Sequence, residues 1–188
     1  MHNSSNNIST FIQDREFEYL LRNVKIKAKQ NLPSIHLDSI IISETKEGNM
    51  IEVPRWVAEV FSELGFCEIQ EESFEVEMLK ALSRERIQGP NQISTLNKNF
   101  YLKLKRYLNQ LKGNTYTNDE SNHDYEEAII KAIDILKLRT VKLLPLTVGE
   151  VTPELMQKVT PEEATLFNIV RDVVQNWKNT VLEGNKNE

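Results

Sequence analysis

The sequence has few of the residues that usually mark a catalytic, redox-active or membrane-spanning protein. It contains a single cysteine, Cys67, so no disulfide can form within the chain, which favours a reducing compartment. Its 6 glycines are scattered singly, and no Gly-x-Gly-x-x-Gly, P-loop or Gly-x-Ser-x-Gly motif occurs. No apolar run approaches the roughly 18 residues that a membrane helix needs. We therefore expect a cytoplasmic protein with no membrane segment and no phosphate-binding loop.

Groups that could hold a metal or perform acid–base chemistry are also scarce. The three histidines, His2, His36 and His123, have no cysteine, histidine or carboxylate partner at the spacing of metal ligands. Carboxylates occur in pairs at residues 71–72, 126–127 and 162–163, each at or near an expected helix start. Negative charge stabilises that end of a helix, which explains the pairs without catalysis. We expect no metal, no cofactor and no catalytic residue, and hence no enzyme.

The overall charge is acidic, with one locally basic stretch. The 188 residues include 23 Lys and Arg against 28 Asp and Glu, a net charge of −5, whereas dedicated nucleic-acid binders usually carry a basic patch. Residues 98–112 are rich in lysine, and pairing with the helix dipole and with solvent is the simpler interpretation. The alternative is a nucleic-acid-binding adaptor in which Lys103, Lys105 and Arg106 contact phosphates.

The first part of the chain predicts a small α+β domain over residues 15–72, after a flexible polar tail at 1–14. Residues 24–29 alternate apolar and lysine, the pattern of a half-buried strand. Further strands are expected at 37–43, 50–53 and 66–69. A helix is expected to begin at Pro54 and to end at Gly65 in a left-handed cap, with Trp56 in the core.

Residues 73–182 predict an α-helical bundle domain, followed by a polar tail at 183–188. Helices are expected at 73–87, 98–111 and 124–144, with a loop at 114–123 and a stop at Pro145. A short helix should follow Thr152, and Thr160 to Glu163 form a capping box for the last helix. The fold class is therefore α+β, mainly α, with the small β-rich domain first and the helical bundle second.

Two of these helices carry more apolar surface than a monomer of this size needs to bury. The core stripe expected on the helix at 124–144 is Tyr125, Ala128, Ile129, Ala132, Ile133 and Leu136. Trp177 on the last helix suits a core and a protein interface equally well. The residues expected at a subunit interface are Tyr125, Ile129, Ile133, Leu166, Val170, Val173 and Trp177.

The order of these parts resembles the GINS family. The sharpest local similarity is Ile-Glu-Val-Pro-Arg-Trp-Val-Ala at residues 51–58, which leads from the small domain into its helix. Residues 136–143 are similar to the family's Arg-x-x-Lys-Leu segment, and residues 78–86 to the first helix of its helical domain. The resemblance spans residues 19–182. It is to the archaeal subunit related to the eukaryotic second and third partner-of-Sld-five subunits, in which the small domain comes first.

The resemblance implies a non-enzymatic structural role at the DNA replication fork. Two copies of such a subunit pair with two copies of a sister GINS subunit in a 2:2 tetramer. That tetramer binds the MCM helicase and a RecJ-like protein, and contacts DNA only indirectly or weakly. It needs no cofactor, and it is cytoplasmic and associated with the nucleoid. The tetramer, its partners and its place at the replication fork are what the resemblance implies, and they do not follow from composition or spacing.

Overall fold

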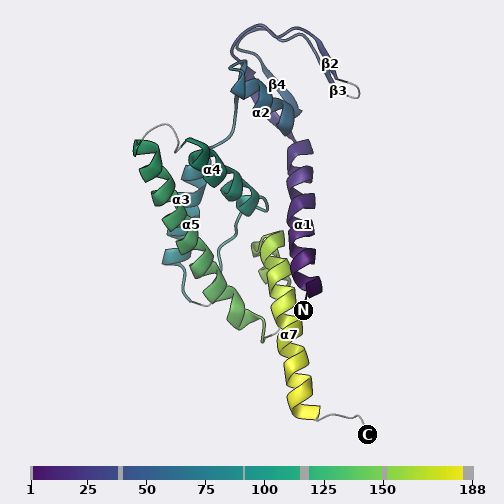
Figure 1. The fold of residues 1–188 in the computed structure, drawn as a ribbon, viewed down its shortest axis with the longest axis vertical. Helices are drawn as coiled ribbons and strands as arrows, with labels where there is room; N and C mark the ends of the chain where they lie inside the picture. The colour runs from purple at the N-terminus through teal and green to yellow at the C-terminus, as the bar shows by residue number, and fades with distance from the viewer. Residues whose placement is uncertain (1, 38–39, 91, 115–118, 150–151, 184–188) are drawn as a thin grey trace. The chain divides into compact units, whose positions relative to one another are not determined.

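The chain divides into two compact units, which we describe separately. The computed structural model describes residues 2–37, 40–90, 92–114, 119–149 and 152–183 (Figure 1). One unit covers Ser9–Ser73, and the other covers Met1–Ile8 and Phe74–Glu188. The division after Ser73 lies one residue from the boundary expected between residues 72 and 73. The structure is mainly helical, with its strands near the N-terminus and its bundle helices after them.

Helix α1, His2–Leu21, replaces the flexible tail that we expected at residues 1–14. That expectation is wrong for the backbone of residues 2–14. The end of the helix is held within the small unit by Tyr19, which is 4% exposed. The guanidinium carbon of Arg55 lies 4.3 Å from the centre of the Tyr19 ring, and Arg55 also pairs with Glu71. A polar N-terminal composition therefore did not exclude a helix.

The small unit is built on a three-stranded antiparallel sheet with β1, Asn23–Ala28, in the middle. The flanking strands are β4, Met50–Pro54, and β5, Cys67–Ile69. Val24, Ile26 and Ala28 are buried while the lysines between them are exposed, so the predicted alternation is confirmed.

The single strand expected at 37–43 is instead a β-hairpin. Strand β2, Ile35–Leu37, pairs with β3, Ile40–Ile42, so that Ile35 lies opposite Ile42. The residues between the two strands lie outside the described part of the chain. Only residues 40–42 of this stretch are β-branched, and the Asp-Ser pair before them is a turn signal that the single-strand prediction did not use.

Helix α2, Arg55–Glu63, covers the small sheet with Val57, Ala58 and Phe61. Pro54 is its N-cap rather than its first residue. Gly65 has φ +78°, which confirms the left-handed cap. Trp56 is 36% exposed, so its predicted place in the core is wrong. Val60 and Leu64, on the same side, are also exposed.

The second unit contains five helices among its described residues after Ser73. They are α3, Phe74–Ile87; α4, Phe100–Asn114; α5, Asp119–Leu146; α6, Pro153–Lys158; and α7, Pro161–Glu183. Pro145 lies inside the last turn of α5, and the helix ends at Leu146, two residues beyond the expected end at residue 144. Of the loop expected at 114–123, residues 119–123 belong to α5, and 115–118 lie outside the described residues.

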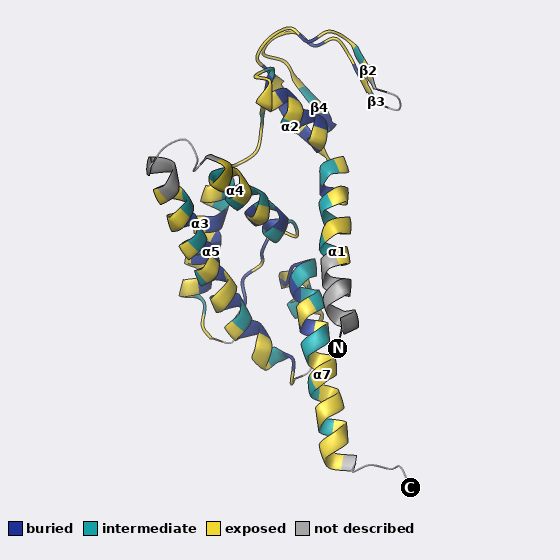
Figure 2. Cartoon of the chain, viewed as in Figure 1, coloured by how far each residue is buried: buried dark blue, intermediate teal, exposed yellow. Residues whose placement is uncertain are grey.

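The core of this unit joins α3, α4 and α5 around Met78, Phe100 and Ile135 (Figure 2). The buried face of α5 is Ala128, Ala132, Ile135, Arg139 and Leu143. The predicted stripe is therefore partly wrong, because Ile133 and Leu136 are 42% and 44% exposed. None of the helices that the structure describes has the length and apolar content needed to cross a bilayer.

Candidate interaction surface

A buried cluster of charges ties α3, α5 and α7 together. Arg139 of α5 is 1% exposed and donates hydrogen bonds to two carboxylates. Its Nε and Nη2 reach Glu163 Oε1 and Oε2 of α7 at 2.7 and 2.5 Å, a bidentate pair. Its Nη1 reaches Glu85 Oε1 of α3 at 2.7 Å and the carbonyl oxygen of Ser94 at 2.5 Å. One side chain thus fixes two helices and the segment between α3 and α4.

Glu163 serves the last helix as well as Arg139. The backbone N–H of Thr160 donates to Glu163 Oε2 at 2.9 Å, and the N–H of Glu163 donates to the Thr160 hydroxyl at 3.3 Å. The predicted capping box is therefore confirmed. The Tyr101 hydroxyl of α4 also donates to Glu163, at 2.7 Å. Burial, and then the Glu163 charge and hydrogen bond, raise the pKa of Tyr101, which therefore stays protonated.

Lys142 completes the cluster and balances its charge. Its Nζ donates to Glu85 Oε2 at 2.9 Å and to the Glu85 carbonyl oxygen at 2.7 Å. Burial alone would raise the pKa of Glu85. The hydrogen bonds from Ser94, Lys142 and Arg139 outweigh it, so that the pKa lies below its usual value. Two cations thus face two carboxylates, and the cluster is a structural clamp with no net charge.

The sequence signal for this cluster was present but was interpreted differently. Arg139 and Lys142 fall within residues 136–143, the segment similar to Arg-x-x-Lys-Leu, and their burial was not predicted, whereas both are buried. Their position on the same face as Ala132, Ile135 and Leu143 could have indicated burial, since a cation on an apolar stripe needs a carboxylate partner. The clamp also explains the Arg-x-x-Lys-Leu segment in physical terms, because Arg139 and Lys142 are its two cations.

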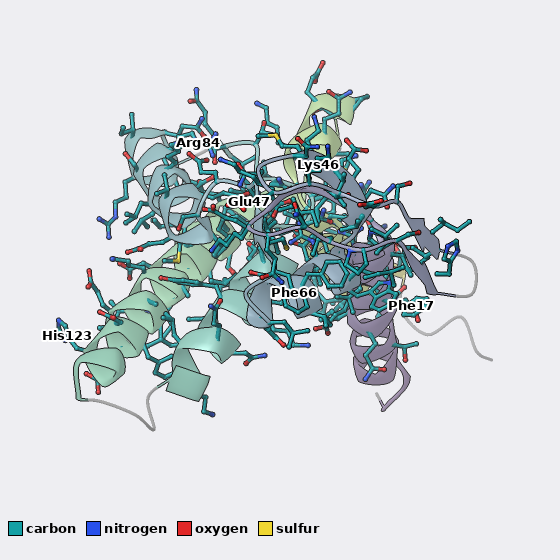
Figure 3. All side chains as sticks on the ribbon, turned by 90° about the horizontal axis from the view of Figure 1, so that it is seen from above. Phe17, Lys46, Glu47, Phe66, Arg84 and His123 are labelled. Atoms are coloured by element: carbon teal, nitrogen blue, oxygen red, sulfur yellow. The ribbon has the colours of Figure 1, made fainter. Side chains whose placement is uncertain are left out.

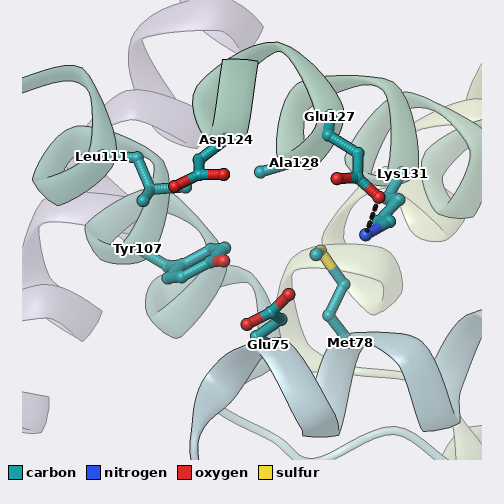
Figure 4. Close-up of a pocket in the computed structure, with 8 residues that line it drawn as sticks. All are labelled: Glu75, Met78, Tyr107, Leu111, Asp124, Glu127, Ala128 and Lys131. Carbon is teal, nitrogen blue, oxygen red and sulfur yellow. Dashed lines mark ion pairs between the residues drawn. The ribbon is translucent and has the colours of Figure 1, made fainter. Parts of the chain in front are cut away.

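A cavity of about 260 Å³ opens between α3, α4 and α5 (Figure 4). Met78, Leu111 and Ala128 give it apolar walls, and the ring of Tyr107 forms one side. Its charged lining residues are Glu75, Asp124, Glu127 and Lys131.

The charges in this cavity are only partly paired. Lys131 donates to Glu127 at 2.6 Å, and that hydrogen bond lowers the pKa of Glu127. Burial, followed by Glu75, Asp124 and Glu127, raises the pKa of Tyr107. Among the described residues, no group of three or more His, Cys, Asp or Glu could hold a metal ion.

His36 and His123, the histidines whose side chains the structure describes, belong to different units. His123 is exposed near the start of α5 (Figure 3). His36 is exposed on β2 with its Nε2 3.3 Å from the Ser34 hydroxyl oxygen. The side chain of His2 lies outside what the structure describes.

An exposed apolar strip of the second unit lies on the C-terminal half of α7. Near the start of this helix Phe167 is buried at 2% exposure, but farther along Val173, Trp177 and Val181 are 62%, 64% and 61% exposed (Figure 2). We call these last three residues the α7 strip. Of the predicted interface residues upstream, Leu166 is 39% exposed. Val170 is half-buried.

The predicted interface residues of α5 divide between inside and outside. Tyr125 and Ile129 are half-buried, and Ile133 is exposed. A second exposed apolar row on α5 was not predicted; it contains Ile130, Val141 and Leu144. Of the residues predicted on α5, one is therefore exposed and two are half-buried.

The alternative phosphate contacts on α4 do not share one surface. Lys103 donates to Glu77 of α3 at 3.0 Å and its side chain is 17% exposed, so it belongs to an ion pair within the bundle. Lys105 is exposed two residues later, and residues at that spacing point to different sides of a helix. Arg106 is half-buried. The fold therefore gives these three cations no common track.

No protein-family model matches the chain, and no curated protein matches it significantly.

Proposed function

We propose that this chain is a non-enzymatic structural subunit of the archaeal GINS type. In this role it pairs with a sister subunit in a 2:2 tetramer that holds the MCM helicase and a RecJ-like protein at the replication fork. The observation that carries the proposal is the α7 strip, in which three large apolar side chains in a row are more than half exposed. Contiguous apolar surface of this kind is typical of a protein interface.

Two further features support a structural role. The small β-containing unit precedes the helical unit, which is the domain order of the family that residues 51–58 and 136–143 resemble. The charge clamp joins three helices and is internally balanced, so its buried polar groups stabilise the bundle rather than face a substrate. A rigid bundle with an uncovered apolar face is well suited to assembly.

Co-expression with the sister subunit tests the proposal. We expect a 2:2 complex by size-exclusion chromatography with light scattering, and MCM among the proteins that the complex recovers from native extract. Val173→Asp should prevent assembly, because it introduces a charge into the interface without touching the core. Ile87→Asp is the matched control, since Ile87 is 82% exposed at the end of α3. A well-behaved monomer that ignores the sister subunit contradicts the proposal.

A further inference from the structure

The outward face of α5 lies opposite the charge clamp. At about 100° per residue, Lys142 lies roughly 180° around the helix from Ile133, and Arg139 lies roughly 120° from it. Because the clamp holds both cations in the core, Ile133 is turned out of the bundle. Ile133 is 42% exposed, and its neighbours Ile130 and Leu136 are 61% and 44% exposed. The unit therefore leaves large apolar side chains uncovered on this side of α5.

A short seam on this face carries opposite charges at its two ends. It consists of Glu126, Ile130, Ile133 and Lys137, which we call the α5 seam. Spacings of four, three and four residues place all four within about 60° of one another around the helix. Glu126 and Lys137 are exposed, and neither forms an ion pair with another described residue. The seam therefore has the same spacing from either end, with the signs of its charges exchanged.

The other described carboxylates near this face are already paired within the unit. Asp134 lies roughly 70° from the centre of the seam and pairs with an arginine of α3 at 2.9 Å. Glu127 lies roughly 90° from the centre on the same side and pairs with the lysine one turn later at 2.6 Å. The opposite side is apolar and contains Ile129 and Leu136. The side chains of residues 114–122 lie outside the described part of the chain.

We infer that two copies of this chain pair through the α5 seam, with their α5 helices antiparallel about a two-fold axis. Ile130 of one copy then faces Ile133 of the other, and Glu126 of one copy faces Lys137 of the other. The symmetry repeats each of these pairings. An apolar centre is thus covered, and an ion pair closes each end. The inference goes beyond the proposed function, because it concerns identical chains and needs no sister subunit.

Other arrangements of the same two helices match their residues less well. In a parallel pair in register, Glu126 meets Glu126 and Lys137 meets Lys137, and both contacts are repulsive. Sliding the antiparallel pair by one heptad places Lys137 opposite Ile133 in one direction and Glu126 opposite Ile130 in the other. A charge is then held against an apolar side chain without a partner. Of these arrangements, only the inferred one matches isoleucine with isoleucine and acid with base.

The length of the contact predicts a weak dimer. The overlap runs from His123 to Thr140, about 26 Å of helix. A shift of eleven residues would bring Val141 and Leu144 into the contact as well, but it places Lys137 against Lys137. Two helices that touch over this length bury less than a standard interface. We therefore expect a dissociation constant on the order of 10 μM.

Analytical ultracentrifugation of the full chain from about 1 to 500 μM tests the inference. We expect a reversible monomer–dimer equilibrium. Glu126→Lys places two lysines opposite each other at both ends of the seam, and Lys137→Glu places two glutamates there. Each variant should raise the dissociation constant at least about tenfold. The controls Glu47→Lys and Lys46→Glu make the same charge changes at exposed positions of the small unit, and should dimerise like the wild type.

Complementary variants test the register. An equimolar mixture of Glu126→Lys and Lys137→Glu has opposite charges at both ends, so it should dimerise although neither variant does so alone. Glu126→Lys/Lys137→Glu in one chain restores both ion pairs with their signs exchanged and should dimerise like the wild type. Circular dichroism at 222 nm checks that each variant keeps its helices. A monomeric wild type at the highest concentration, single variants that dimerise like the wild type, or a folded mixture that stays monomeric overturns the inference.

The dimer and the proposed function can fail separately. Val173→Asp, which should prevent assembly with the sister subunit, leaves the α5 seam untouched and should not change the dimer. If the lone chain dimerises through the seam but ignores the sister subunit, the inference stands and the GINS proposal fails. If the 2:2 complex forms, is indifferent to Glu126→Lys, and the lone chain is monomeric throughout, the GINS proposal stands and the inference is wrong.

Discussion

Replacing Arg139 with methionine should strongly destabilise the helical unit, because it leaves the cluster with an uncompensated charge. The intact cluster contains two carboxylates, Glu85 and Glu163, and two cations. Without Arg139 the buried site carries one net negative charge. Breaking a buried pair in this way costs about 3–5 kcal/mol. The change also removes the hydrogen bond to the Ser94 carbonyl oxygen.

Urea denaturation followed by circular dichroism at 222 nm measures this loss, since most helical residues lie in the helical unit. With a slope of about 2 kcal/mol per molar urea, the midpoint should fall by roughly 1.5–2.5 M. Arg84→Met is the matched control. Arg84 lies on α3 beside Glu85 but is exposed (Figure 3), so its loss should cost under about 0.5 kcal/mol.

A double variant separates charge from packing. Arg139→Met/Glu85→Gln returns the buried site to neutrality and should be less destabilised than the sum of the two single variants. Additive losses would mean that the clamp acts through packing alone. A midpoint for Arg139→Met that equals that of Arg84→Met would refute the clamp altogether.

Three further outcomes follow from single side chains. The pKa of Glu85 is lower in the folded protein than in the unfolded chain, so its carboxylate stabilises the fold fully above about pH 4.3. This stabilisation is lost as the pH falls through the folded pKa. The difference in urea midpoint between wild type and Glu85→Gln should therefore shrink as the pH falls below about 4.3. Gly65→Ala should lower stability by about 1 kcal/mol because φ is +78° there, whereas Gly113→Ala in α4 should raise the melting temperature slightly. Cys67 is 1% exposed, and burial raises the pKa of its thiol although Lys29 lowers it. A thiol reagent should therefore label Cys67 quickly only in denaturant. Rapid labelling of the native chain would contradict this.

Local signals in the sequence were sufficient wherever the structure depends on neighbouring residues. The alternation at Val24 and Ile26 predicted a half-buried strand, and Thr160 with Glu163 predicted the start of α7. Both depend on contacts within a few residues, so a short window contains the necessary information. The left-handed cap at Gly65 is a third example.

Contacts between distant segments were not accessible in this way. Glu85 and Arg139 are 54 residues apart in sequence, and nothing near either residue shows that they meet. The prediction placed Ile133 on the buried face of α5 because it was apolar, whereas the fold buries Arg139 and leaves Ile133 at the surface. Which face of α5 points into the core depends on the carboxylates of α3 and α7. They pair with Arg139, whose charge would otherwise keep it out of the core.

The clamp also determines why the α7 strip is uncovered. Glu163 and Phe167, four residues apart, lie in the buried part of α7, where Glu163 pairs with Arg139 and Phe167 packs against Leu143 and Val159. Helical periodicity carries nearly the same face onward to Val170, Val174 and Trp177. Exposure rises along this row, from half-buried at Val174 to 64% at Trp177. The apolar strip is therefore the continuation of a core face beyond the point where this unit covers it. A substitution that loosens the clamp should weaken partner binding without altering any residue of the strip.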